Sequence, residues 1–238
     1  MTKLWNALKL IGGVLGIFTG AIVAYWVAVS PWHVKWGATD EDAASALPGD
    51  EQVQRPTFNS TRAITIRARP EHIWPWLVQM GQGRGGMYSY DVLENLLRPA
   101  ARSVDRIVPE LQNLNVGDVI GIEPGGSAYT VVDIRPNEYL LLLSNGALRA
   151  GAGQAKQAPA GQSSWLFLLR PVDAEHTQLI VRWRARINIF QSIRAFALGL
   201  VIEPIQFVME RRMMLGIKER AEKLNRSTSQ VDSSAGVC

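Results

Sequence analysis

Apolar and polar residues alternate with a period of two through most of the second half of the chain. This period predicts five strands: Asp118–Ile122, Tyr129–Ile134, Tyr139–Ser144, Ser164–Leu169 and Gln178–Ile187. Short turn-forming segments separate several of these runs, which favours antiparallel hairpins over crossover connections. Residues 61–68 alternate in the same way and predict an earlier strand, with Ile64 and Ile66 on one face. The sequence therefore predicts an antiparallel sheet.

Helical patterns flank the predicted strands. Pro70–Met80 predicts a helix that Pro75 kinks or shortens, and Ser89–Leu97 predicts a second helix. Apolar residues then recur every three or four positions from Ile202 to Leu224, which is typical of a long amphipathic helix. That helix must bury its apolar stripe, and the concave face of the sheet offers the place. A ligand pocket is expected between the helix and the sheet.

A continuous apolar run lies near the N-terminus. Leu10–Val29 holds twenty residues without a charged side chain, and a helix of this length reaches about 30 Å, the thickness of a bilayer core. Tryptophans lie near both ends, as in membrane-spanning helices. We therefore expect residues 1–36 to form a retained single-pass membrane anchor, with its helix at about residues 10–29. A cleaved signal peptide is the alternative.

The anchor carries two further expectations. Lys3 and Lys9 precede the run and Lys35 follows it, so the positive-inside rule favours a cytoplasmic N-terminus and an extracytoplasmic domain. Gly12, Gly16 and Gly20 repeat every four residues. Such a spacing is either ordinary membrane-helix composition or a face through which two copies form a homodimer.

Charge divides the remainder of the chain. Residues 37–60 hold five acids against one base, and their Pro and Gly content predicts an acidic tether. Residues 61–226 form the predicted domain, and the small, polar residues 227–238 predict a disordered tail. Arg182, Arg184 and Arg186 alternate along a strand and share one face, which is either a solvated outer face or a cationic stripe facing lipid.

Composition excludes several classes of protein. The net charge of +4 is too small to indicate nucleic-acid binding. One cysteine excludes an intrachain disulfide framework and a Cys/His zinc cluster, and the three histidines lack metal-ligand spacing. The segment 81–86 matches G-x-G-x-x-G, but no βαβ pattern surrounds it, so a tight loop is the simpler interpretation. We expect no metal and no cofactor.

Several stretches resemble the SRPBCC, or START-like, superfamily. They are TRAITIRARPEHIWPWLVQMGQGRGGMYSYDVLENL, NVGDVI, SSWLFLLRP, TQLIVRWR and FVMERRMMLGIKERAE. The likeness is greatest to a subgroup of uncharacterised, membrane-anchored members, and it covers about residues 61–223. It implies an α+β helix-grip fold, in which an antiparallel sheet wraps around a long C-terminal helix. It also implies a cavity for a lipid, polyketide or other apolar molecule, but no single reaction. The segment 146–162 departs from the pattern and predicts a loop.

Seven residues are the candidates for ligand contact. They are Trp74, Trp76, Arg84, Tyr88, Tyr90, Trp165 and Trp183. The aromatic rings would line or roof the cavity, the tyrosine hydroxyls would face the ligand, and Arg84 would meet a polar end. For the aromatic residues, packing in the core is the alternative.

Three functions remain open from the sequence. The first is binding of a hydrophobic or amphipathic, lipid-like molecule, with no catalysis. The second is a cyclase or isomerase that uses the same cavity, which requires Asp91, Glu110, Glu203 or Glu210 to point inward, away from arginine. The third is a membrane scaffold whose core is filled by its own side chains. The first is our expectation, with small molecules and membrane lipid as partners.

Overall fold

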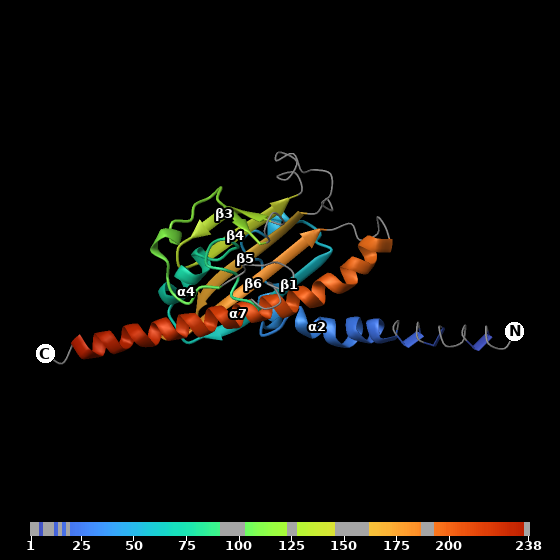
Figure 1. The fold of residues 1–238 in the computed structure, drawn as a ribbon, viewed down its shortest axis with the longest axis horizontal. Helices are drawn as coiled ribbons and strands as arrows, with labels where there is room; N and C mark the ends of the chain where they lie inside the picture. Colours follow the sequence, from blue (N-terminus) through green and yellow to red (C-terminus); the bar gives the residue numbers. More distant parts are fainter. Residues whose placement is uncertain are drawn as a thin grey trace.

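A six-stranded antiparallel sheet wraps around one long helix in the computed structural model (Figure 1). The structure describes residues 5–6, 12–13, 16–17, 20–90, 103–122, 128–145, 162–186 and 193–235. The strands are β1 (Phe58–Ile66), β2 (Val119–Gly121), β3 (Ala128–Arg135), β4 (Tyr139–Asn145), β5 (Gln162–Pro171) and β6 (Thr177–Arg186). Their order across the sheet is β1-β6-β5-β4-β3-β2.

Helical segments lie on both sides of this sheet. They are η1 (Tyr25–Val29), α2 (Ser30–His33), α3 (Asp40–Ala44), η2 (Asp50–Gln52), α4 (Pro70–Val78), η3 (Pro109–Leu111) and α7 (Ile193–Ala235). Pro204 lies within α7, and the helix continues through most of the segment 227–238 that the sequence predicts as a tail.

The strand pattern confirms the predicted α+β helix-grip arrangement. Every neighbouring pair of strands is antiparallel, and β1 pairs with β6 along its whole length. The long C-terminal helix follows the last strand and crosses one face of the sheet (Figure 1). Two predictions lie outside the described residues: residues 91–97 of the expected second helix, and the loop 146–161.

The main core lies between the inner face of the sheet and α7. Met214, Ile217 and Ala221 of α7 are fully buried, as are Phe167 of β5 and Val181 of β6. The helical period of the first three and the alternate positions of the last two are the features from which the sequence predicts this contact. Because Ile73, Trp76 and Leu77 of α4 belong to the same cluster, side chains fill the interior where α4, α7 and the sheet meet.

Gly216 permits the close approach of α7 to the loop after α4. A Cβ atom at this position would overlap the backbone carbonyl oxygen of Tyr88, which cannot move as a flexible side chain does. We expect Gly216→Ala to lower the free energy of unfolding by about 1–3 kcal/mol, the usual cost of overpacking. Urea denaturation measures the change. Gly20→Ala is the control, because nothing lies within 4 Å of its Cβ position; equal stability of the two variants would contradict the prediction.

The expected membrane anchor is wrong. Within the described ranges, no helix is both long enough and apolar enough to cross a membrane. The predicted orientation, with a cytoplasmic N-terminus and an extracytoplasmic domain, depends on that anchor and is wrong with it. Part of the expected run, including residues 10–11, 14–15 and 18–19, lies outside the described residues. Beyond the run, His33 and Trp36 pack their rings against Phe207 of α7, so aromatic residues that suggested a membrane interface contribute to the fold. A single chain does not test the homodimer through Gly12, Gly16 and Gly20, which stays a prediction.

The chain after α2 covers the edge of β1. The backbone N–H groups of Thr61 and Ala63 donate to the carbonyl oxygens of Val34 and Trp36, at 2.8 and 3.0 Å. Such pairing protects an edge strand that would otherwise present free hydrogen-bonding groups. Gly37 then turns the chain with a φ of +72°, and a Cβ there would overlap Ala63 O. The turn leads the chain onto the outer face of the sheet.

The acidic segment 37–60 covers that outer face, where the sequence suggests a tether. Leu47 packs in a second apolar cluster with Leu141, Leu166 and Ile180 of the sheet. A capping box at Thr39 starts α3 and fixes the Asp42 side chain. Further along, Asp50 forms ion pairs with both Arg182 and Arg184, at 2.6 and 3.0 Å. The arginines thus share one face, as predicted, but Arg182 and Arg184 face acids rather than water; only Arg186 is exposed.

Candidate ligand-binding site

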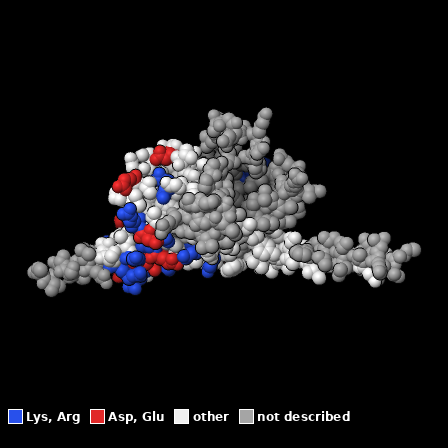
Figure 2. All heavy atoms as spheres, in the orientation of Figure 1, with Lys and Arg blue, Asp and Glu red and all other residues white. Residues whose placement is uncertain are grey.

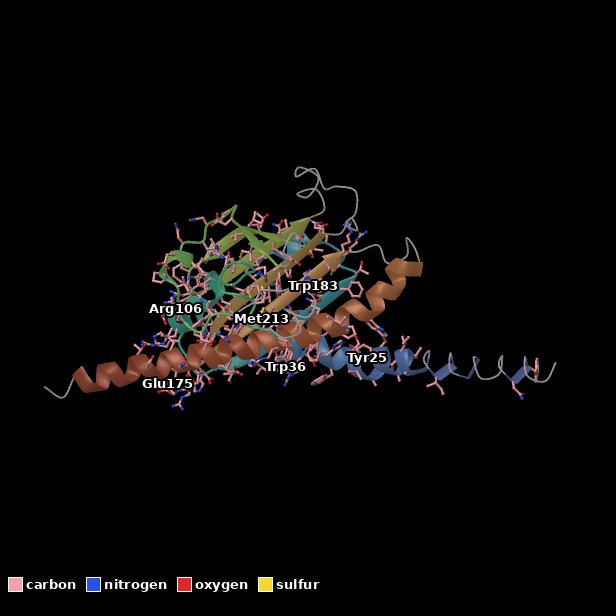
Figure 3. All side chains as sticks on the ribbon, viewed as in Figure 1. Tyr25, Trp36, Arg106, Glu175, Trp183 and Met213 are labelled. Carbon is pink, nitrogen blue, oxygen red and sulfur yellow. The ribbon has the colours of Figure 1, made fainter. Side chains whose placement is uncertain are left out.

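Polar side chains gather on the inner face of the sheet, towards the start of β1 and the end of β6. We call eight of them the inner polar cluster: Ser60 and Arg62 on β1, Tyr129 on β3, Ser163 and Trp165 on β5, Trp183 on β6, and Gln206 and Glu210 on α7. Ser60, Trp183 and Trp165 are register partners on neighbouring strands. Directly opposed residues point to the same side of a sheet, so these three stand in one row that faces α7 (Trp183 is labelled in Figure 3).

A chain of hydrogen bonds links three members of the cluster. The indole N–H of Trp183 donates to the hydroxyl of Tyr129 at 3.1 Å, and that hydroxyl lies 2.9 Å from Ser163 Oγ. Burial raises the pKa of Tyr129; the hydrogen bonds to Ser163 and Trp183 oppose the shift, and the charge of Glu210 adds to it. The phenol therefore stays neutral and serves as a hydrogen-bonding group.

A buried ion pair joins β1 to α7 beside this chain. Arg62 Nη1 donates to Glu210 Oε1 at 2.8 Å, and the two side chains are 0% and 1% exposed. Arg62 Nε also donates to the carbonyl of His33, and its guanidinium lies 5.2 Å from the ring centroid of Phe207. The side-chain amide of Gln206 reaches the second oxygen of Glu210 at 3.4 Å. The pair fixes the position of α7 over the sheet.

Three polar atoms of the cluster are buried without a hydrogen bond to any described residue. They are Ser60 Oγ, Trp165 Nε1 and Gln206 Oε1. An unsatisfied buried polar group costs about 1–3 kcal/mol, and native proteins rarely leave several together. A bound molecule with matching donors and acceptors would satisfy them.

A pocket of about 140 Å³ opens at this end of the sheet. It is lined by Trp26, Val34, Thr57, Phe58, Asn59, Ser60 and Trp183. Ser60 and Trp183 thus belong to both the pocket and the inner polar cluster. The other walls come from the N-terminal segment and the start of β1, so the segment expected to lie in a membrane forms part of the pocket.

The sequence-predicted site residues fall into two groups. Trp165 and Trp183 lie on the inner face together with Tyr129. The ring centroids of Tyr129 and Trp165 are 5.7 Å apart. Trp76 of α4 and Tyr88 of the following loop pack beside a later part of α7. Their rings meet edge to face with centroids 6.0 Å apart, and Arg220 of α7 stacks on the Tyr88 ring. The structure therefore does not bring the seven candidates into one site.

The environment of the second group is that of a packed core. Burial raises the pKa of Tyr88 to about 12, against the opposing effects of Gln79, Arg220 and Arg84. Trp74 is half-buried against the same core, and Tyr90 is exposed. The guanidinium of Arg84 donates to the carbonyls of Val78 and Leu111, at 3.2 and 3.1 Å. Arg84 therefore holds the glycine-rich loop in place. Ligand contact by this group stays a prediction.

Sequence reasoning missed Ser60, Arg62, Tyr129 and Ser163. The signal for the first two is their parity, because Ser60 and Arg62 precede Ile64 and Ile66 by even numbers of residues and must share their face. Of the carboxyl groups considered for catalysis, Glu210 points inward but is paired with Arg62, and Glu110 is exposed. Asp91 and the side chain of Glu203 lie outside the described residues.

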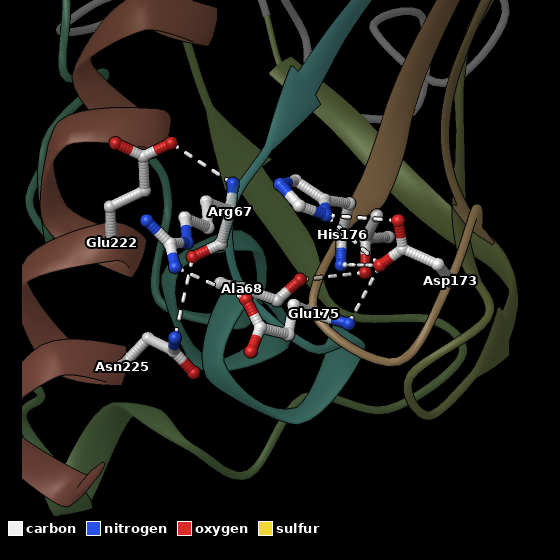
Figure 4. A network of polar contacts seen from close by, with 8 residues as sticks. Arg67, Ala68, Asp173, Glu175, His176, Glu222 and Asn225 are labelled. Atoms are coloured by element: carbon white, nitrogen blue, oxygen red, sulfur yellow. Dashed lines mark hydrogen bonds and ion pairs between the residues drawn. The ribbon is translucent and has the colours of Figure 1, made fainter.

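The opposite end of β1 and β6 carries a network with a structural role (Figure 4). The Thr177 hydroxyl donates to the carbonyl of Ala68 at 2.8 Å, and the N–H of Arg67 donates to Glu222 of α7 at 3.0 Å. Asp173 accepts from the backbone N–H groups of Glu175 and His176 in the β5–β6 turn. These contacts join the turn, β1 and α7, and they hold this end of the sheet against the helix. Among the described residues, no group of three or more His, Cys, Asp or Glu has a geometry suited to a metal ion.

His33 makes folding sensitive to acid. Burial, with a smaller effect from Arg62, lowers its pKa from the ordinary 6.5 to about 4. As the pH is lowered from 6.5 to 4, His33 is protonated in the unfolded chain but stays neutral in the folded chain. The free energy of unfolding therefore decreases as the pH decreases across this window. Relative to His33→Gln, we expect the wild type to lose on the order of 1–3 kcal/mol between pH 7 and 4. Urea titrations at several pH values measure the loss. A loss in His33→Gln as large as that of the wild type would contradict the prediction.

Comparison with known proteins gives likenesses of fold at low identity. No family model and no curated protein matches the chain. A hypothetical protein from Helicobacter pylori is 9% identical, with 75% of this chain and 96% of that one covered and a TM-score of 0.46. A conserved protein from Geobacillus kaustophilus is 14% identical, with coverages of 70% and 96% and a TM-score of 0.42. Ara h 8.0201 is 15% identical, with coverages of 71% and 98% and a TM-score of 0.39. The superfamily suggested by the sequence stays a prediction, and the strand order with its closing helix identifies the chain as an α+β protein of helix-grip architecture.

Proposed function

We propose that the protein binds a hydrophobic or amphipathic small molecule between the inner face of its sheet and α7. The observation that carries the proposal is the set of buried polar atoms on Ser60, Trp165 and Gln206 that have no partner within the described ranges. Ser60 lines a pocket whose walls are mainly aromatic and aliphatic, and Trp165 is the register partner of Trp183, which lines the same pocket. Ligand sites in proteins combine such walls with a few polar groups that fix orientation.

Apolar burial would supply most of the affinity, at about 25 cal/mol for each Å² removed from water. The polar atoms would then select molecules with a hydroxyl, carbonyl or amide at the matching position, because a mismatched ligand leaves them buried and unsatisfied. A lipid-like molecule is one member of this class.

Two observations favour binding over the alternatives. Glu210 is inward but held by Arg62 at 2.8 Å, whereas a cyclase or isomerase needs an inward carboxyl free to exchange a proton. The scaffold alternative predicts an interior filled along its whole length. The core around Trp76 and Tyr88 fits that description, but Trp183, in the same apolar cluster, also lines a pocket.

Binding can be tested on the purified full chain with three probes: dodecanoic acid, dodecan-1-ol and 2-naphthol. Native mass spectrometry and calorimetry should detect a one-to-one complex with at least one of them. Trp165→Phe keeps the ring but removes the unpartnered N–H, and it should weaken binding of that probe by about two- to tenfold. Trp32→Phe changes an exposed tryptophan that does not line the pocket; it is the control and should leave affinity unchanged. Failure of all three probes to bind would refute the proposal.

A further inference from the structure

We infer that the pocket beside Trp183 is a subsite for a flat, uncharged aromatic ring system that carries a hydroxyl or carbonyl group. This inference rests on the proposed function and narrows it to one chemical class. Four features of the pocket support it: the arrangement of its aromatic walls, its single deep polar atom, its lack of charge and its volume.

The aromatic walls come from three parts of the chain. Phe58 of β1 and Trp183 of β6 lie nearly parallel, with an interplanar angle of 28° and centroids 6.4 Å apart. Trp26 of η1 adds a third ring to the lining. Aromatic rings attract one another beyond the burial of their area when they stack or meet edge to face. A flat conjugated ligand would gain this attraction from several rings, and a saturated ligand of the same shape would not.

Ser60 is the deep polar group of the pocket. It is 4% exposed, lines the pocket, and its hydroxyl has no hydrogen-bond partner in the part of the chain that the structure describes. Its register partner is Trp183, so the two side chains are neighbours on the same face of the sheet. Thr57 and Asn59, the other polar lining residues, are exposed. The pocket therefore offers one buried hydrogen-bonding group, the Ser60 hydroxyl.

The pocket favours a neutral ligand. None of its lining residues carries a charge. The arginines that flank Trp183 in sequence point to the outer face, where Asp50 pairs with both. In the view of Figure 2, the charged side chains that are coloured lie on the side of the molecule towards the C-terminal end of α7. An anionic ligand would find no cation among the lining residues, and the buried Arg62 of the inner polar cluster is already paired with Glu210.

The volume limits the size of the ring system. The pocket measures about 140 Å³, close to the ~150 Å³ apolar cavity known to accept a benzene molecule. One ring fits within it, and a second fused ring fits when it reaches into the mouth. A long aliphatic chain would have to extend beyond the pocket.

The test compares 2-naphthol with decahydro-2-naphthol, its saturated counterpart, by calorimetry on the full chain. We expect 2-naphthol to bind about three- to tenfold more tightly. Ser60→Ala should remove about two- to tenfold of the 2-naphthol affinity and leave naphthalene unaffected. Ser164→Ala removes a buried hydroxyl from the outer face of the sheet and should change neither. Phe58→Leu should bring the two naphthols to similar affinities, which tests the stacking without Ser60.

The outcomes separate this inference from the function on which it rests. Equal binding of 2-naphthol and decahydro-2-naphthol, or an unchanged affinity in Ser60→Ala, overturns the aromatic subsite. Binding of dodecan-1-ol without binding of 2-naphthol overturns the subsite but leaves the proposed function in place. If no probe binds, both are refuted.

Discussion

Replacing Arg62 with methionine is expected to lower the free energy of unfolding by about 3–5 kcal/mol. The reason is the carboxylate that remains. Glu210 is as deeply buried as Arg62, with 1% of its side chain exposed, and an unpaired charge at that depth costs far more than the pair contributes. For a domain whose total stability is about 5–15 kcal/mol, this loss should appear as a large fall in the urea midpoint.

A double variant isolates the cause. Arg62→Met combined with Glu210→Met removes both charges and keeps apolar volume, so it should recover most of the stability lost by the single change. Recovery stays incomplete because Arg62 Nε also donates to His33 O at 2.9 Å. A double variant as unstable as Arg62→Met alone would show that the uncompensated charge is not responsible.

The sheet was predictable because its information is local. Alternation from Val181 to Arg186 indicates which side chains face the core, and short turns favour antiparallel pairing. The same parity places Trp165 and Trp183 on one face once the strands pair. The closing helix was equally readable, since Met213, Ile217 and Ala221 form its buried stripe at helical spacing.

The charged contacts were not predictable because their partners are remote in sequence. Arg62 meets Glu210 across 148 positions, and Arg182 meets Asp50 across 132. Read locally, an acid-rich stretch with proline and glycine is typical of a tether, and three arginines on one strand face are typical of a solvated surface. Only the fold brings the acidic segment against the arginines of β6. Their opposite charges then compensate each other, so neither needs to face water.

The aromatic candidates show a second reason why the sequence did not predict the site. Trp76 and Trp183 have the same side chain and similar burial, at 3% and 9% exposed, yet one packs against Tyr88 and the other borders a pocket. Sequence identifies both as large apolar groups but does not say which neighbours fill the space around them. The N-terminal run fails in the same way, because a long apolar stretch satisfies the spacing of a membrane helix whether or not it forms one.

Replacing Arg182 with methionine is expected to release the outer-face segment and lower the free energy of unfolding by about 3–4 kcal/mol. Its guanidinium is 3% exposed and donates to Asp50 and to the carbonyls of Asp42, Ala43 and Ser45. Methionine removes this donor from the carbonyl oxygens of Ala43 and Ser45, whereas the Asp42 carbonyl keeps the Ser45 hydroxyl at 3.1 Å. Asp50 keeps its ion pair with Arg184, which limits the loss.

The structural origin of this loss can be followed by limited proteolysis. Because Arg182 donates four hydrogen bonds to α3 and residues 45–53, a protease should cut between residues 39 and 53 in Arg182→Met under conditions that leave the wild type intact. Arg186→Met is the matched control, since Arg186 lies on the same strand face but is exposed, and its cleavage pattern should equal that of the wild type. Resistance of both variants to cleavage would mean that the apolar contact of Leu47 with the sheet, rather than the charge, holds the segment. The acidic segment would then be attached by the same force that forms the core, with Arg182 serving only to neutralise it.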